Sequence, residues 1–181
     1  ILNLKINLND LNQFLVWQNN YKFEEPFPQF VKEKVFNKYN LENSIWIETG
    51  TYLGTSTSYF SKISKHVHTI EPSKKYFNIS KENLKNIENV SIYNGASEEI
   101  LPDILNLIND NENVCFWLDG HFSGGDTFKG SADTPILLEL KTIANSIKKF
   151  NNITILIDDF RLFSEGGNEE YPSKEQIISW E

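Results

Sequence analysis

Short apolar segments alternate with helix-like segments along most of the chain. The apolar segments carry Ile, Val, Phe, Trp and Leu side chains in runs of the length expected for buried strands. They are residues 45–47, 67–70, 90–93, 114–118 and 153–157. Between them, hydrophobic side chains recur at helical spacing. The pattern predicts an α/β fold, with a doubly wound, mostly parallel sheet and helices on both faces.

The last of these predicted helices, residues 136–150, has a clear apolar stripe. Thr134 and Pro135 come just before it, and they are typical of a helix start. Earlier in the chain, Ser97 is a candidate N-cap for a helix over 97–108. The stripe of the last helix is formed by Leu137, Leu140, Ile143, Ala144 and Ile147.

Two further helices are predicted before the first strand, between Asp10 and Tyr39, with Pro26 and Pro28 separating them. We expect one domain over 1–181, consisting of a helical cap (1–43), a cofactor-binding core (44–161) and a tail (162–181). The cap has two interpretations: a cover for one face or edge of the sheet, or a lid over the site. Aromatic side chains that gather there are the reason to consider a lid, and the first helix also has an apolar stripe. The aromatic residues are Trp17, Tyr21 and Phe23, and the stripe is Leu11, Phe14, Leu15 and Gln18.

The amino-acid composition excludes or disfavours several classes of partner and site. The 181 residues carry 25 acidic against 17 basic side chains, a net charge of −8, which disfavours a nucleic-acid partner. Cys115 is the single cysteine, so an internal disulfide and a cysteine-based zinc site are excluded, and we expect a reducing, cytoplasmic location. No apolar run approaches the roughly 20 residues of a membrane span. Because the chain begins at Ile1 and contains no methionine, we expect the natural start to be missing.

The segment Ser44–Phe60 organises the site. An apolar strand breaks at Glu48-Thr49-Gly50, and a helical pattern then resumes, as at the nucleotide-facing corner of a doubly wound sheet. Gly50 permits a sharp turn and Gly54 a close backbone approach. The spacing differs from the dinucleotide Gly-x-Gly-x-x-Gly because Tyr52 stands where the middle glycine would be, which weakens a pyrophosphate-binding interpretation.

Acidic residues end four of the predicted strands, and their positions indicate chemistry. Glu71 follows the second strand, where a carboxylate can accept hydrogen bonds from both hydroxyls of a ribose; the alternative is a solvated loop glutamate. Asp119, Asp158 and Asp159 follow the fourth and fifth strands, and three oxygen ligands suit Mg²⁺, Ca²⁺ or Mn²⁺. The alternative there is that Asp158 or Asp159 only caps a turn.

Together with Glu48-Thr-Gly-Thr-Tyr-Leu-Gly54 and Asp119-Gly-His, these strand ends resemble those of class I S-adenosylmethionine-dependent methyltransferases. Within that superfamily the chain is most similar to metal-dependent O-methyltransferases that modify sugars on macrolide and aminocoumarin antibiotics. The resemblance runs from about Ser44 to Arg161 and rests on the order and spacing of the motifs.

The resemblance implies a role for each matching residue. Glu48 and Gly50 would border the methionine part of the cofactor, within a loop that includes Thr51, Tyr52 and Gly54. Glu71 would hold the ribose, and Ala96 and Ser97 would lie against the adenine. Asp119, Asp158 and Asp159 would bind Mg²⁺, which would orient an acceptor hydroxyl and lower its pKa. His121 or Asp119 would act as the catalytic base.

Departures from the pattern leave alternatives open. The superfamily sheet has a sixth and a seventh strand that this chain does not show, so either the chain is truncated or its tail is built differently. The alternatives are a metal-independent methyltransferase, an NAD-dependent oxidoreductase or epimerase, and a binding module that has lost the chemistry. The expected partner is a small hydroxylated acceptor such as a sugar, with no nucleic acid and no membrane, and the sequence does not indicate an oligomeric state.

Overall fold

The structure is a computed structural model that describes residues 7–24, 27–120, 134–163 and 171–179. The chain divides into two compact units, Ile1–Tyr39 and Asn40–Glu181. Each unit is described separately below.

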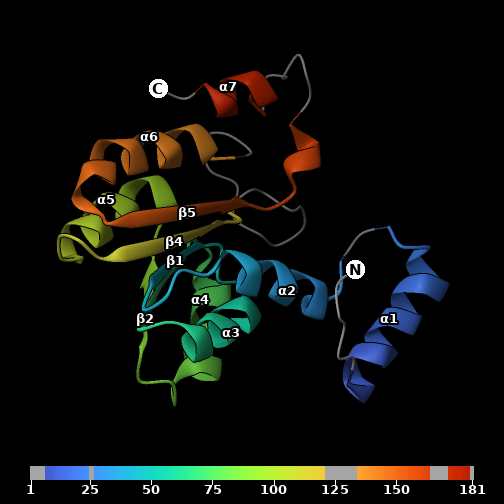
Figure 1. Ribbon diagram of the computed structural model, residues 1–181. Coiled ribbons are helices and arrows are strands. Elements are labelled where there is room, and N and C mark those ends of the chain that lie inside the picture. The colour runs from blue at the N-terminus through green and yellow to red at the C-terminus, as the bar shows by residue number, and fades with distance from the viewer. Residues whose placement is uncertain (1–6, 25–26, 121–133, 164–170, 180–181) are drawn as a thin grey trace. The chain divides into compact units, whose positions relative to one another are not determined.

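The larger unit contains a sheet of five parallel strands in the order β3-β2-β1-β4-β5 (Figure 1). The chain starts at the centre of the sheet, builds outward through β2 and β3, and then returns to the other side of β1. This is the doubly wound order, and it confirms the predicted fold class. The strands are β1 (Ile45–Thr49), β2 (His66–Glu71), β3 (Val90–Asn94), β4 (Asn113–Leu118) and β5 (Asn152–Ile157).

Helices cover both faces of this sheet, α3 and α4 on one face and α5 and α6 on the other (Figure 1). Short 3₁₀ turns follow α6 and β5, and the C-terminal α7 begins with a capping box in which Ser173 and Gln176 bond each other's backbone. The described residues include no helix long and apolar enough to cross a lipid bilayer. The helices are α3 (Thr55–Ile63), α4 (Lys74–Leu84), α5 (Ser97–Leu107), α6 (Ile136–Ser146) and α7 (Lys174–Ile178).

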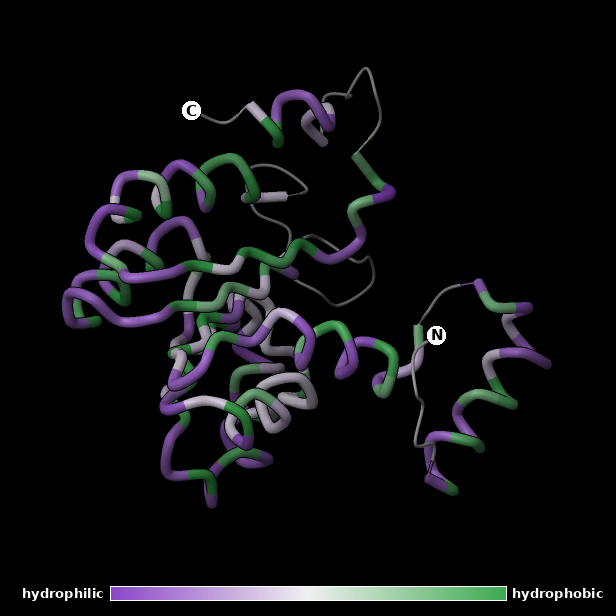
Figure 2. The backbone as a smooth tube through the Cα atoms, in the orientation of Figure 1, coloured by the Kyte–Doolittle hydropathy of each residue, from purple (hydrophilic) through white to green (hydrophobic). Residues whose placement is uncertain are grey.

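Alternating side chains of the strands form two cores, one on each face of the sheet. On the α3 face, Trp46 stacks on Phe60 with ring centroids 4.1 Å apart, and both side chains are fully buried. On the other face, Ile45 and Ile47 belong to a larger apolar cluster with α5 and α6. The middle of β4 and of β5 is accordingly hydrophobic (Figure 2).

The predicted stripe of α6 is wrong at two positions. Leu137 and Ile147 are 39% and 38% exposed, whereas Ile136 and Glu139 are buried. The helix is rotated relative to the predicted stripe, so its buried face starts at Ile136 and includes a glutamate. It also ends at Ser146, so that Ile147 belongs to a 3₁₀ turn.

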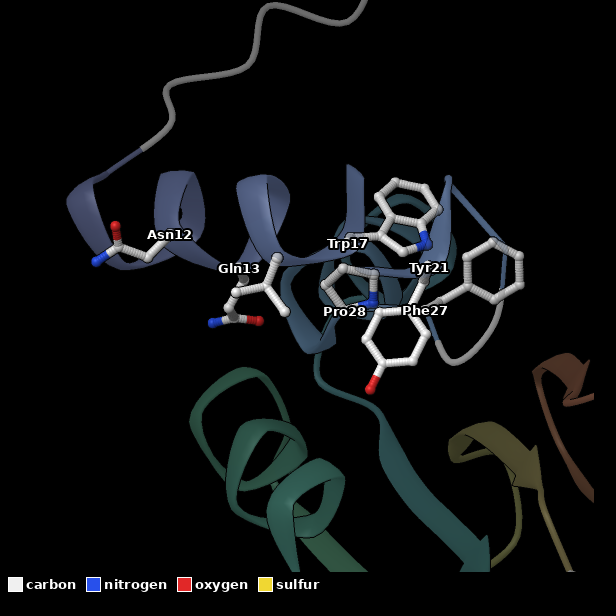
Figure 3. A pocket seen from close by; sticks show the side chains of 7 residues that line it. Asn12, Gln13, Trp17, Tyr21, Phe27 and Pro28 are labelled. Atoms are coloured by element: carbon white, nitrogen blue, oxygen red, sulfur yellow. The ribbon is translucent and has the colours of Figure 1, made fainter. Parts of the chain in front are cut away.

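The N-terminal unit contains α1 (Leu8–Tyr21) and α2 (Gln29–Tyr39), which confirms the two predicted helices. None of the α1 side chains is buried, so its predicted apolar stripe is not a core face. Its aromatic side chains gather instead around Trp17, whose ring centroid lies 5.1 Å from that of Phe23 and 5.7 Å from that of Phe27. Beside them is an open, largely apolar pocket of about 310 Å³ (Figure 3). It is lined by Asn12, Gln13, Val16, Trp17, Tyr21, Phe27 and Pro28.

Candidate functional site

The turn between β1 and α3 lies at the point where the strand order reverses, the usual place for a ligand in an open α/β sheet. Both of its glycines have left-handed backbone conformations, with φ of +90° at Gly50 and +82° at Gly54. A Cβ atom on Gly50 would lie 2.3 Å from the carbonyl oxygen of Asp119, and one on Gly54 would lie 3.0 Å from the side chain of Leu84. Glycine is therefore required at both positions, as predicted from the sequence.

Hydrogen bonds from backbone N–H groups fix this turn against the end of β2. The N–H groups of Gly50 and Thr51 donate to the carbonyl oxygen of Ile70, at 2.9 and 3.2 Å. The N–H of Tyr52 donates to Oε2 of Glu71, at 2.7 Å. The candidate cofactor loop and the candidate ribose-binding carboxylate thus form one hydrogen-bonded unit.

Glu71 itself is held firmly. Its second carboxylate oxygen, Oε1, accepts a hydrogen bond from the N–H of Ser73 at 2.9 Å, and the side chain is 5% exposed. Burial raises the pKa of Glu71 above its usual value, and the bonds from Tyr52 and Ser73 act in the opposite direction. Because a carboxylate oxygen can accept more than one hydrogen bond, both oxygens retain capacity for a ligand hydroxyl.

Glu48 lies inside the protein, 1% exposed. Its Oε2 accepts hydrogen bonds from the hydroxyls of Thr57 on α3 and, at 2.7 Å, of Thr69 on β2. The hydroxyl of Thr51 lies 2.6 Å from that of Thr69. Glu48 therefore joins strand, helix and turn at this corner, and its predicted role beside the methionine part of a cofactor stays a prediction.

The start of α5 lies next to this corner. The side-chain amide of Asn94 donates to the carbonyl oxygen of Glu71 at 2.8 Å, which ties the ends of β3 and β2 together. Ala96 occupies the N-cap position and Ser97 is the first helical residue, so the predicted Ser97 N-cap is wrong by one position. The Ser97 side chain is buried and lies beside the Glu139 carboxyl group.

Glu139 is the site residue that sequence reasoning missed. It lies on the buried face of α6, 1% exposed, and the hydroxyls of Ser97 and Thr49 lie beside its carboxyl group, where they favour its charged form. Burial raises its pKa to about 7. A signal was present in the sequence, because a glutamate three residues after Ile136 and four before Ile143 shares their side of a helix.

The three candidate metal ligands follow two adjacent strands, but their side chains are not arranged as a metal site. The N–H of Asp158 donates to the carbonyl oxygen of Leu118 at 3.0 Å, so Asp119 and Asp158 follow neighbouring strands in register. Asp159, in contrast, forms an ion pair with Arg161. Among the described residues, no three or more His, Cys, Asp or Glu side chains are arranged to hold a metal ion. The magnesium site therefore stays a prediction.

The candidate base His121 lies outside the described residues. The other two histidines, His66 and His68, lie on β2 with ring centroids 4.6 Å apart. His66 pairs with the hydroxyl of Ser91 at 2.9 Å, and His68 with that of Tyr93 at 3.0 Å. Burial, with a smaller contribution from His66, lowers the pKa of His68 to about 4. Both histidines pair with hydroxyls of β3 and lie in the first half of β2, away from the carboxyl ends of the strands.

Comparison with known proteins gives one kind of match. No protein-family model and no curated protein sequence matches this chain. Solved structures do match. A protein from Clostridium thermocellum proposed as an rRNA methylase aligns with 86% of this chain and 82% of its own, at 14% identity and a TM-score of 0.54.

Two further solved structures are similar to this chain. Precorrin-6y C5,15-methyltransferase from Geobacter metallireducens aligns with 72% of this chain and 62% of its own, at 16% identity and a TM-score of 0.50. A Streptococcus mutans protein described as a methyltransferase, solved in complex with S-adenosylhomocysteine (SAH), aligns with 70% of this chain and 68% of its own, at 20% identity and a TM-score of 0.47. At these identities the likeness concerns the fold, and the strand order seen here agrees with it. The protein therefore has a Rossmann-like fold that it shares with methyltransferases of known structure.

Proposed function

We propose that this protein is an S-adenosylmethionine-dependent O-methyltransferase that acts on a hydroxyl of a small molecule such as a sugar. The observation that carries the proposal is the hydrogen-bonded unit of Tyr52 and Glu71, beside a glycine turn at the switch point of a methyltransferase fold. This unit presents a fixed carboxylate where the ribose of a nucleoside cofactor would bind.

The charge of the strand ends also supports this cofactor. S-adenosylmethionine carries a sulfonium and an ammonium group, and carboxylates at the ends of parallel strands favour a cation. In the transfer, the acceptor oxygen attacks the methyl carbon, the carbon–sulfur bond breaks with its electron pair remaining on sulfur, and the hydroxyl proton passes to a base. We propose His121 or Asp119 as that base.

A divalent metal is a further part of the proposal. Asp119 and Asp158, which follow adjacent strands, would supply two hard oxygen ligands, and Asp159 would complete the set only after separating from Arg161. When bound, Mg²⁺ would polarise the acceptor hydroxyl. If Asp119 and Asp158 are metal ligands, Asp119→Asn and Asp158→Asn should each abolish a magnesium-dependent heat in calorimetry. A wild-type protein that binds SAH but shows no Mg²⁺ heat would favour the metal-independent alternative.

A small acceptor is favoured over RNA by charge. The net charge of −8 opposes a phosphate backbone, although one structure with this fold comes from a proposed rRNA methylase. Transfer of labelled methyl groups from S-adenosylmethionine to hydroxylated small molecules, with total RNA as a parallel substrate, distinguishes the two. Label in RNA and not in any small molecule would overturn this part of the proposal.

The cofactor class is tested by calorimetric titration of SAH. We expect SAH to bind with a micromolar dissociation constant. Glu71→Ala should weaken this binding by about 1–3 kcal/mol, because the polar groups that pair with the carboxylate are then left unpaired. Glu82→Ala is the matched control, since Glu82 lies exposed on α4 and pairs only across one helical turn with Lys85. If the folded protein binds NAD and does not bind SAH, the proposal is refuted in favour of the oxidoreductase alternative.

A further inference from the structure

Three carboxyl side chains are buried among the described residues, and Glu139 is the one to which the proposed function gives no role. The other two, Glu48 and Glu71, accept hydrogen bonds at the β1–β2 corner. Glu139 projects from the first turn of α6, and its Oε1 atom is buried without a hydrogen-bond partner among the described residues. A buried oxygen in that condition is rare enough to need an explanation.

The position of Glu139 is unfavourable for stability. Within the described part of the chain, no cation stabilises the charged form of Glu139. Burial and the neighbouring Glu98 disfavour that form, and the nearby hydroxyls of Ser97 and Thr49 favour it. An apolar side chain of similar size would avoid this cost. Groups that cost stability and lie beside a ligand crevice are typical of functional sites, where stability is exchanged for activity.

The contacts of Glu139 join separate parts of the candidate cofactor site. Thr49 is the last residue of β1, directly before Gly50, and its hydroxyl accepts a hydrogen bond from the N–H of Asp119 at 3.2 Å. Ser97 is the first residue of α5. A Cβ atom on Gly120 would lie 3.2 Å from Oε1 of Glu139, so the chain after β4 also passes close to this carboxyl group.

We propose that Glu139 is a positioning residue of the cofactor site, which acts through Thr49 and Ser97 to hold the ends of β1 and β4 against the start of α5. The inference rests on the proposed function, because the segments it holds carry the residues expected around the cofactor. Glu139 is not required to touch the cofactor. Its carboxyl group lies beside the Thr49 hydroxyl, which accepts from the N–H of Asp119 at 3.2 Å and so supplements the bond of that N–H to the Thr49 carbonyl oxygen at 3.0 Å.

Two variants of Glu139 separate positioning from a merely structural role. Glu139→Leu removes the polar contacts and keeps the bulk, so the melting temperature at pH 8 should equal or exceed that of the wild type. The affinity for SAH should nevertheless fall by about tenfold or more, since the ends of β1 and β4 are no longer held against the start of α5. Glu139→Gln retains an acceptor for both hydroxyls, and its affinity should stay within about threefold of the wild type.

Variants of Thr49 repeat the test without changing α6. Thr49→Val removes the connecting hydroxyl and should weaken SAH binding like Glu139→Leu, whereas Thr49→Ser should restore it. The double variant Glu139→Leu/Thr49→Val should bind no more weakly than the poorer single variant, because both act through one connection. Additive losses in the double variant would contradict the inference.

Hydrogen exchange supplies a readout that does not need the cofactor. In Glu139→Leu and Thr49→Val, the amide of Asp119 should exchange about tenfold faster, while the amide of Val67, bonded to Asn89 at the opposite end of the sheet, stays unchanged. Unchanged Asp119 exchange, or SAH affinity retained in Glu139→Leu, would overturn the inference. So would a loss of binding that follows a lowered melting temperature and is not restored in Glu139→Gln. If the wild type itself does not bind SAH, the proposed function fails. The exchange rates alone then decide whether Glu139 holds the ends of β1 and β4 in place.

Discussion

The buried carboxyl group of Glu139 makes a quantitative prediction about stability and pH. Its pKa rises from the reference value of 4.5 to about 7 in the folded protein. Between these two values the native state keeps a proton that the unfolded state has lost. The contribution of Glu139 to stability therefore declines as the pH rises from about 4.5 to about 7, and is constant above that range.

The magnitude follows from the size of the shift. One pKa unit corresponds to about 1.4 kcal/mol, so a shift of this size corresponds to about 3 kcal/mol. Glu139→Gln removes the titration and keeps the shape. The difference in free energy of unfolding between the variant and the wild type should therefore grow by about 3 kcal/mol in favour of the variant between pH 4 and pH 8.

Urea unfolding at a series of pH values measures this difference directly. A pH-independent offset, such as an imperfect fit of the amide, shifts the whole difference curve and leaves its slope unaffected. Exposed carboxylates titrate alike in both proteins and cancel. Parallel stability curves for the wild type and Glu139→Gln would refute the assignment of a neutral, buried carboxyl group.

Three other predictions follow from the fold. The pKa of His68 is lowered to about 4, so His68 stays neutral in the native state while the unfolded state takes up a proton below about pH 6.5. The free energy of unfolding, measured with urea, should therefore fall as the pH is lowered from about 6.5 to about 4, and it should fall less in His68→Gln. Cys115 is buried with a raised pKa, so a thiol reagent should modify it slowly in the native protein and fast in guanidinium; rapid native modification would contradict its burial. Gly50→Ala should lower the free energy of unfolding by about 1–3 kcal/mol, because φ at this position is +90° and the added Cβ atom would lie 2.3 Å from the carbonyl oxygen of Asp119. Unchanged stability would contradict this conformation of the turn.

The sheet could be predicted because its strands are continuous apolar runs that end at polar residues. β4 is buried over all but its first residue, and β5, although half-buried at the edge of the sheet, is also rich in isoleucine, so hydrophobicity alone identifies both. The adjacency of Asp119 and Asp158 followed from the right-handed winding of such sheets. Helix faces were harder to predict. The predicted stripe of α6 did not include Glu139, because the sequence does not show that hydroxyls on β1 and α5 lie beside its carboxyl group.

The candidate site could be predicted only in outline. Spacing placed Glu71 near the glycine turn, and the bond from the N–H of Tyr52 confirms that they are neighbours. Spacing could not show that the carboxylate of Glu48 turns inward to Thr57 and Thr69, because that direction depends on the packing of α3. Nor could it show that Asp159 pairs with Arg161, which depends on the local turn after β5.

The most direct test of the central claim is a crystal structure of the protein with SAH bound. The account predicts that both ribose hydroxyls lie within hydrogen-bonding distance of the Glu71 carboxylate, with the ligand across the carboxyl ends of β1 and β2 and the adenine against Ala96. SAH bound elsewhere, or a ribose that does not contact Glu71, would contradict it.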